Sequence, residues 1–159
     1  MKHRKIPVLF LLVLLAMCFM ACAAEKTQEE PYYYETDGKK IYIGQETDDA
    51  VAILGEDYEY FEAASCAVEG LDMFYYYHNL TLTANEIDGK KIITDIYFKN
   101  DAVATTEGIR INMEYAKVMD VYGSDYEMSG TMMEYIRGNT ILCIDIRDKK
   151  VAAIEYKMK

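Results

Sequence analysis

The side chains with the most reactive chemistry in this sequence are His78, Cys66 and Cys143. A histidine can act as a base, but no nucleophile elbow, Walker loop, dinucleotide fingerprint or HExxH pattern accompanies it. One histidine and two distant cysteines also match no known spacing of zinc ligands. We therefore predict no catalytic residues, no bound metal and no cofactor, and we expect a protein that is not an enzyme.

Calcium needs a separate argument because acidic residues are plentiful. Asp88 and Gly89 have the look of an EF-hand loop for two residues, but Ala84 and Glu86 stand where the first and third ligands belong. We interpret Asp88 and Gly89 as the turn of a β-hairpin.

Cys66 and Cys143 lie 77 residues apart, so a disulfide between them would join the two halves of the chain. Such a bridge is permitted outside the cytoplasm. We expect two reduced, partly buried thiols, and the disulfide stays open as the alternative.

The first 22 residues predict where the protein works. Three basic residues precede an apolar run over residues 8–19, which is too short for a permanent membrane-spanning helix. The run ends at Ala21 and Cys22, which resembles the lipobox of bacterial lipoproteins, although Phe19 stands where leucine is usual. We predict a signal peptide over residues 1–21, a palmitate-type lipid on Cys22 and a flexible tether over residues 22–31. The alternative is an ordinary secretory signal cleaved near Ala23 or Ala24.

Lipidation at Cys22 implies a location on the cell membrane, facing away from the cytoplasm. Two acyl chains hold a protein on a bilayer where one does so only marginally. The leader contains three of the 17 basic residues and none of the 27 acidic ones, which leaves a net charge of −13 after its removal. Because this charge repels phosphate backbones, we expect no nucleic-acid partner.

The chain aligns with itself. Residues 41–59 match residues 109–127 without a gap, with seven of 19 positions identical, among them Gly55 and Gly123. This similarity predicts two units, residues 32–103 and 104–159. We expect the fold class to be α+β, with two repeats of a short helix packed on an antiparallel β-meander, joined into one continuous sheet.

Each unit is expected to contain a short helix that ends at a glycine, Gly55 or Gly123. Thr47 and Asn112 are the expected N-caps. Alternating apolar residues and Asp-Gly or Gly-Asn turns predict three strands per unit, with a further hairpin at the start of the domain. The expected strands cover residues 32–35, 40–43, 73–77, 80–87, 92–99, 132–137, 140–147 and 151–157.

This order of elements, given twice, resembles the β-lactamase inhibitor protein fold and the SmpA/OmlA envelope lipoproteins. Residues 65–72 and the aromatic strand that follows are similar to uncharacterised tandem-repeat lipoproteins of Gram-positive bacteria. The resemblance implies an alternative function, namely inhibition or regulation of a secreted enzyme, but it carries over no site residues because fold does not transfer activity.

Tyrosine is the compositional anomaly, with 15 residues and no tryptophan. Neighbouring tyrosines in a strand face opposite sides of the sheet, so Tyr75 and Tyr77 face outward if Tyr76 packs inward. We therefore name Tyr75 and Tyr77 as a candidate binding face for a protein or peptide at the cell envelope. The alternative is cross-strand aromatic pairing, which needs no ligand.

Overall fold

The computed structural model describes residues 30–66 and 70–159. Within these residues, strand accounts for 51% and helix for 13%. The elements, in chain order, are β1 (Tyr33–Thr36), β2 (Lys39–Tyr42), α2 (Thr47–Leu54), β3 (Glu59–Ala64), β4 (Leu71–Tyr76), β5 (Leu80–Ile87), β6 (Lys90–Phe98), α3 (Tyr115–Tyr122), β7 (Glu127–Ser129), β8 (Met132–Arg137), β9 (Thr140–Arg147) and β10 (Lys150–Met158).

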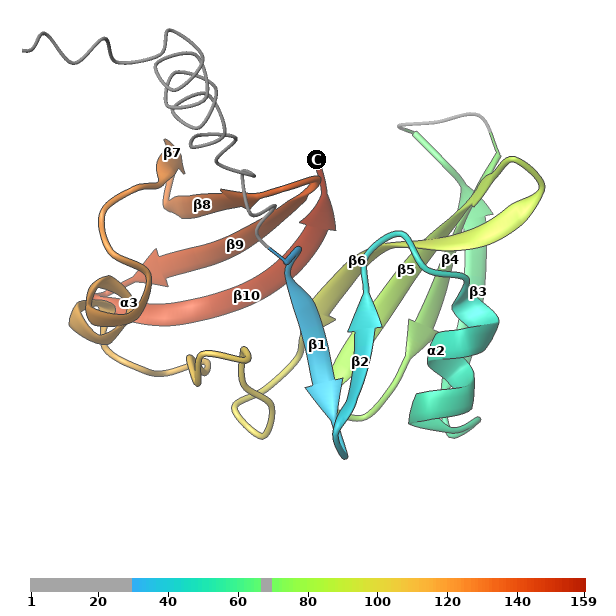
Figure 1. Ribbon diagram of the computed structural model, residues 1–159, viewed down its shortest axis with the longest axis horizontal. Helices are drawn as coiled ribbons and strands as arrows, with labels where there is room; N and C mark the ends of the chain where they lie inside the picture. Colours follow the sequence, from blue (N-terminus) through green and yellow to red (C-terminus); the bar gives the residue numbers. More distant parts are fainter. Residues whose placement is uncertain (1–29, 67–69) are drawn as a thin grey trace, which may run out of the picture.

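Eight strands form one antiparallel sheet in the order β3-β4-β5-β6-β10-β9-β8-β7, and β1 and β2 form a separate hairpin. Helix α2 lies on the half of the sheet formed by β3 to β6, and α3 lies on the half formed by β7 to β10 (Figure 1). The hairpin lies between these halves, where Tyr34 packs edge-on against Phe98 and Tyr32 stacks on Tyr156. One side of the sheet is therefore buried under the helices and the hairpin.

The predicted fold class is wrong. The protein is mostly β, built around the eight-stranded sheet, and is not an α+β arrangement of two helix-and-meander repeats. Two strands were missed, β3 and β7, and these form the two edges of the sheet. Most of their residues are exposed, so neither segment shows the apolar alternation by which a half-buried strand is recognised in a sequence.

The two halves of the sheet meet where β6 pairs with β10, and we call this pairing the seam. Ile154 lies opposite Phe98, and Tyr156 lies opposite Ile96. All four side chains are fully buried in the core. Burial of large side chains at one place makes the seam the centre of the apolar core.

Both short helices end at a glycine with positive φ, Gly55 at 86° and Gly123 at 73°. This conformation is costly for any residue with a Cβ atom. At the other end, the expected N-caps are wrong. The N-cap residues are Glu46 and Glu114, and neither side chain makes a capping hydrogen bond. The hydroxyl of Thr47 instead donates a 3.0 Å hydrogen bond to the carbonyl of Lys91, which attaches α2 to β6.

We expect Phe98→Ala to lower the free energy of unfolding by about 3–5 kcal/mol, because it leaves a cavity at the seam. Tyr97→Ala is the matched control on the same strand, since the Tyr97 side chain is 41% exposed and its loss should cost about 1 kcal/mol or less. Urea unfolding of both variants measures the difference. Equal losses would contradict the assignment of the core to the Phe98 side of β6.

Candidate functional site

The structure does not place Tyr75 and Tyr77 on an exposed face. Only 5% of Tyr75 and 8% of Tyr77 is exposed, and Tyr76 between them is the exposed member at 37%. The hydroxyl of Tyr77 donates a 3.0 Å hydrogen bond to the carbonyl of Gly55, at the end of α2. This contact fixes the orientation of the strand in which Tyr75 and Tyr77 point towards the helix and Tyr76 points away from it. The prediction that Tyr75 and Tyr77 form an exposed binding face is therefore wrong.

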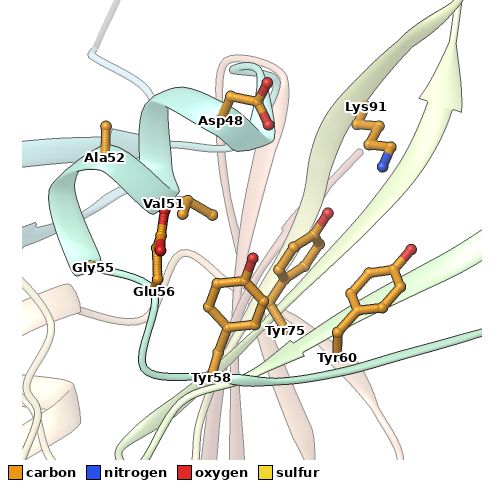
Figure 2. A pocket seen from close by; sticks show the side chains of 9 residues that line it. All are labelled: Asp48, Val51, Ala52, Gly55, Glu56, Tyr58, Tyr60, Tyr75 and Lys91. Carbon is orange, nitrogen blue, oxygen red and sulfur yellow. The ribbon is translucent and has the colours of Figure 1, made fainter.

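Tyr75 nevertheless contributes to a pocket of about 700 Å³ between α2 and strands β3 and β4. We call it the tyrosine pocket. It is lined by Asp48, Val51, Ala52, Gly55, Glu56, Tyr58, Tyr60, Tyr75 and Lys91. Figure 2 shows that the hydroxyls of its three tyrosines point the same way, towards the side of the pocket where Asp48 and Lys91 lie.

The three rings of the tyrosine pocket form a contiguous group. Tyr75 lies between Tyr58 and Tyr60, with ring centroids 5.1 Å apart in each pair. Burial raises the pKa of Tyr75, and the hydrogen bond that Tyr60 donates to Glu62 at 2.5 Å raises the pKa of Tyr60 to about 12. The hydroxyls of Tyr60 and Tyr75 therefore stay protonated at neutral pH. The Tyr60 hydroxyl donates its one proton to Glu62, so it can only accept a hydrogen bond from a ligand, whereas the Tyr75 hydroxyl can donate one. The nearby carboxylates favour a cationic ligand.

The opposite side of the same strands carries a row of three rings, of which the outer two are exposed and the central one is half-buried. Phe61, Phe74 and Tyr76 stack with centroids about 6 Å apart, at 6.1 Å and 6.0 Å, and with interplanar angles of 26° and 6°. We call these three residues the aromatic strip. Phe61 is 53% exposed and Tyr76 is 37% exposed. Phe61 is not among the predicted binding residues because it lies in the unrecognised strand β3, although the run of apolar and aromatic residues after Asp57 could have indicated it.

Beside the aromatic strip, a shallow depression of about 520 Å³ contains two acidic side chains, Asp95 and Glu155. Asp95 comes from β6 and Glu155 from β10, so the pair bridges the seam. Burial, the hydrogen bond to Glu155 and the charge of Glu155 raise the pKa of Asp95 to about 9, against a smaller opposing effect of Lys157. Asp95 is therefore neutral at pH 7 and can donate its proton in a hydrogen bond to the Glu155 carboxylate.

The expected reduced thiols are present, and the alternative disulfide between Cys66 and Cys143 is not formed. Cys66 is exposed and Cys143 is buried, so neither thiol is partly buried as expected. Burial raises the pKa of Cys143 to about 11, which keeps it as a thiol. His78 is exposed in the turn between β4 and β5. Across the described ranges, no three potential metal ligands come together.

Cys22 and the predicted signal peptide over residues 1–21 lie outside the described residues, as does most of the predicted tether. In the part of the chain that the structure describes, no helix is both long enough and apolar enough to span a membrane.

The acid pair gives a prediction about pH. Because the pKa of Asp95 is raised on folding, the folded protein keeps a proton that the unfolded chain releases above about pH 4. The stabilising effect of this group is therefore complete below pH 4 and is lost as the pH rises towards 9. Asp95→Asn mimics the protonated state. Because Asp95 is only partly buried, we discount the shift and expect a gain of about 1–2 kcal/mol at pH 8 and little change at pH 4.

Urea unfolding at the two pH values measures this effect. Asp101→Asn, at an exposed loop position, is the matched control and should leave the difference between the two pH values unchanged. An Asp95→Asn protein with the same pH dependence as the parent would contradict a shared proton at Asp95 and Glu155.

Comparison with known proteins adds no relative: no family model, curated protein or solved structure matches this chain. The resemblances suggested by the sequence therefore remain predictions, and the geometry of the tyrosine pocket, the aromatic strip and the acid pair is the evidence on function.

Proposed function

We propose that this protein is a lipid-anchored, non-enzymatic domain that binds a protein or peptide partner outside the cytoplasm, at the cell envelope. The observation that carries the proposal is the aromatic strip, Phe61, Phe74 and Tyr76, together with its exposure to solvent. Three nearly parallel rings make a flat apolar surface on the side of the sheet that the helices do not cover.

Such a surface suits recognition by a protein. Aromatic side chains are enriched in the cores of interfaces, and they have few rotatable bonds to order on binding. A partner that covered Phe61 would gain part of the about 1.5–3 kcal/mol that burial of a large apolar side chain supplies. Tyr97 on β6, which is 41% exposed, adds apolar area on the same side of the sheet, beside Phe74 and Tyr76. The extent of this surface supports binding more than it supports a structural role.

Charge narrows the chemistry of the partner. The whole chain has a formal net charge of −10. The aromatic strip is bordered by Glu59 on β3 and by Glu155 at the seam, where Asp95 is neutral and Lys99 also lines the depression. An acidic border attracts a basic partner and slows the approach of an acidic one. We propose a partner that combines apolar side chains with basic ones.

The proposed anchor would keep this surface close to the membrane. If Cys22 is acylated, the segment that joins it to Tyr33 spans at most about 40 Å when fully extended. Tethering at this distance raises the effective concentration of the domain for partners on the same membrane.

Metabolic labelling with a palmitate analogue tests the anchor. We expect the parent protein to incorporate the label and to fractionate with membranes. Cys22→Ser should lose both properties because it lacks the acylated thiol. Cys66→Ser, which removes the exposed free thiol, is the matched control and should be labelled like the parent. Equal labelling of the parent and Cys22→Ser would exclude lipidation at this residue.

Affinity capture from intact cells tests the binding surface. The double variant Phe61→Ser and Tyr76→Ser should recover its partner with at least about 30-fold lower affinity, which is the usual effect of removing a central interface residue worth about 2 kcal/mol. The control is Met128→Ser with Ile136→Ser, which replaces two exposed hydrophobic residues in the other half of the sheet. If both double variants retain parental affinity for every captured protein, the aromatic strip is not the binding surface.

A further inference from the structure

Strand β3 is an edge of the eight-stranded sheet and pairs on one side only, with β4. Five of its six residues are exposed and Ala63 is half-buried. The opposite edge, β7, has only three residues. Of the two edges, β3 alone is long enough to pair with an extended segment over several residues.

The register shows which backbone groups of β3 are free. The amide of Ser65 donates a 3.0 Å hydrogen bond to the carbonyl of Gly70, so this pair is of the hydrogen-bonded type. Hydrogen-bonded and non-hydrogen-bonded pairs alternate along an antiparallel ladder, and the pairing of β3 with β4 contains no bulge. The backbone groups of Phe61 and Ala63 therefore face β4. Those of Tyr60, Glu62 and Ala64 face outward, away from the sheet.

The side chains of β3 alternate between two recognition surfaces. Tyr60 lies opposite Tyr75 and lines the tyrosine pocket, and its hydroxyl contacts Glu62 on the same side of the sheet. Phe61 lies opposite Phe74 and belongs to the aromatic strip on the other side. A strand added to β3 would place its successive side chains alternately beside these two surfaces.

The charges around β3 indicate the composition of such a strand. On the side of the tyrosine pocket, Asp48, Glu56 and Glu62 outnumber Lys91. A partner residue on this side meets phenol rings and carboxylates, which favour lysine or arginine. A second copy of this chain would add another Glu59 and another Glu62 to this acidic edge, so like-charge repulsion opposes self-pairing.

We propose that β3 captures an extended segment of the partner as an additional antiparallel strand. In that segment, basic side chains lie opposite Tyr60 and Glu62, beside the tyrosine pocket, and an apolar side chain lies opposite Phe61. Backbone hydrogen bonds to Tyr60, Glu62 and Ala64 hold the segment, and the alternation of basic and apolar side chains selects it. This inference rests on the proposed binding function and specifies how the partner is recognised.

Residue-resolved amide hydrogen exchange on the full chain tests this mode of binding. The probe is a seven-residue peptide in which lysine alternates with valine, with both ends blocked. In the free protein, the amides of Tyr60, Glu62 and Ala64 should exchange rapidly, while those of Phe61 and Ala63 are protected by β4. Saturating peptide should slow exchange at the first three by at least about tenfold.

Two control peptides distinguish the contribution of backbone hydrogen bonds to binding from the contribution of charge. The same lysine–valine peptide with its lysine amides methylated keeps its charges, but those amides can no longer donate hydrogen bonds to the carbonyls of β3. This peptide should give no protection of the amides of Tyr60, Glu62 and Ala64. A glutamate–valine peptide keeps the backbone but reverses the charge, and it should bind at least about tenfold more weakly.

Substitutions in β3 give a second readout. Ala64→Pro removes one outward amide without changing the charge or the pairing with β4, a position where proline is tolerated at a sheet edge, and it should weaken peptide binding. Glu62→Gln should weaken binding by about twofold to fivefold. The control Glu59→Gln, on the same strand but on the other face, should change the affinity for the lysine–valine peptide less than Glu62→Gln does.

The two proposals fail in different ways. A captured partner whose affinity depends on the aromatic strip but is unaffected by Ala64→Pro and Glu62→Gln would overturn strand addition and leave the binding function intact. A lysine–valine peptide that binds without protecting Tyr60, Glu62 and Ala64 would also overturn strand addition. If the parent protein captures no partner from cells and does not bind the lysine–valine peptide, both proposals are overturned.

Discussion

β6 and β10 pair through four residues on each strand, and this seam converts two sets of four strands into one sheet with two distinct sides. On one side, Ile96, Phe98 and Tyr156 form the centre of the core against which the hairpin packs. On the other side, the same strands bring Asp95 close to Glu155. If the seam did not form, β6 and β10 would both be exposed edges, and neither the core nor the acid pair would exist.

Part of the tyrosine excess has a structural explanation. The loop after each helix repeats the sequence Gly-x-Asp-Tyr-Glu, and in both loops a tyrosine hydroxyl from a sheet strand donates to the glycine carbonyl. Tyr77 donates to Gly55 and Tyr135 donates to Gly123, each at 3.0 Å. The loop tyrosine, Tyr58 or Tyr126, packs against rings of that strand. These buried phenols attach the ends of the short helices to the sheet, which isolated helices of this length need in order to be stable.

The sequence predicts the buried elements of this fold better than its surface. The turns at Asp88 and Gly89 and at Gly138 and Asn139 place two hairpins correctly, because Asp88, Gly89 and Gly138 adopt a positive φ that aspartate and glycine tolerate better than most residues. Strand β3 was missed because its residues are exposed on both faces, and its pairing with β4 depends on contacts distant in sequence. The side towards which Tyr75 points was equally undetermined, since alternation fixes only that Tyr76 points the other way. Contacts with Tyr58 and with the end of α2 determine that Tyr75 points towards the helix.

The position of β3 explains why one small region can recognise a ligand in two chemically different ways. A strand at the interior of the sheet has one neighbour on each side, so its backbone is fully used and only its side chains are available. β3 has a free backbone edge, and its neighbouring residues Tyr60 and Phe61 belong to opposite sides of the sheet. The tyrosine pocket on one side is polar and the aromatic strip on the other is apolar. Because the buried rings of Tyr75 and Tyr77 secure β4 beneath the helix, β3 can remain exposed without depending on its own burial for stability.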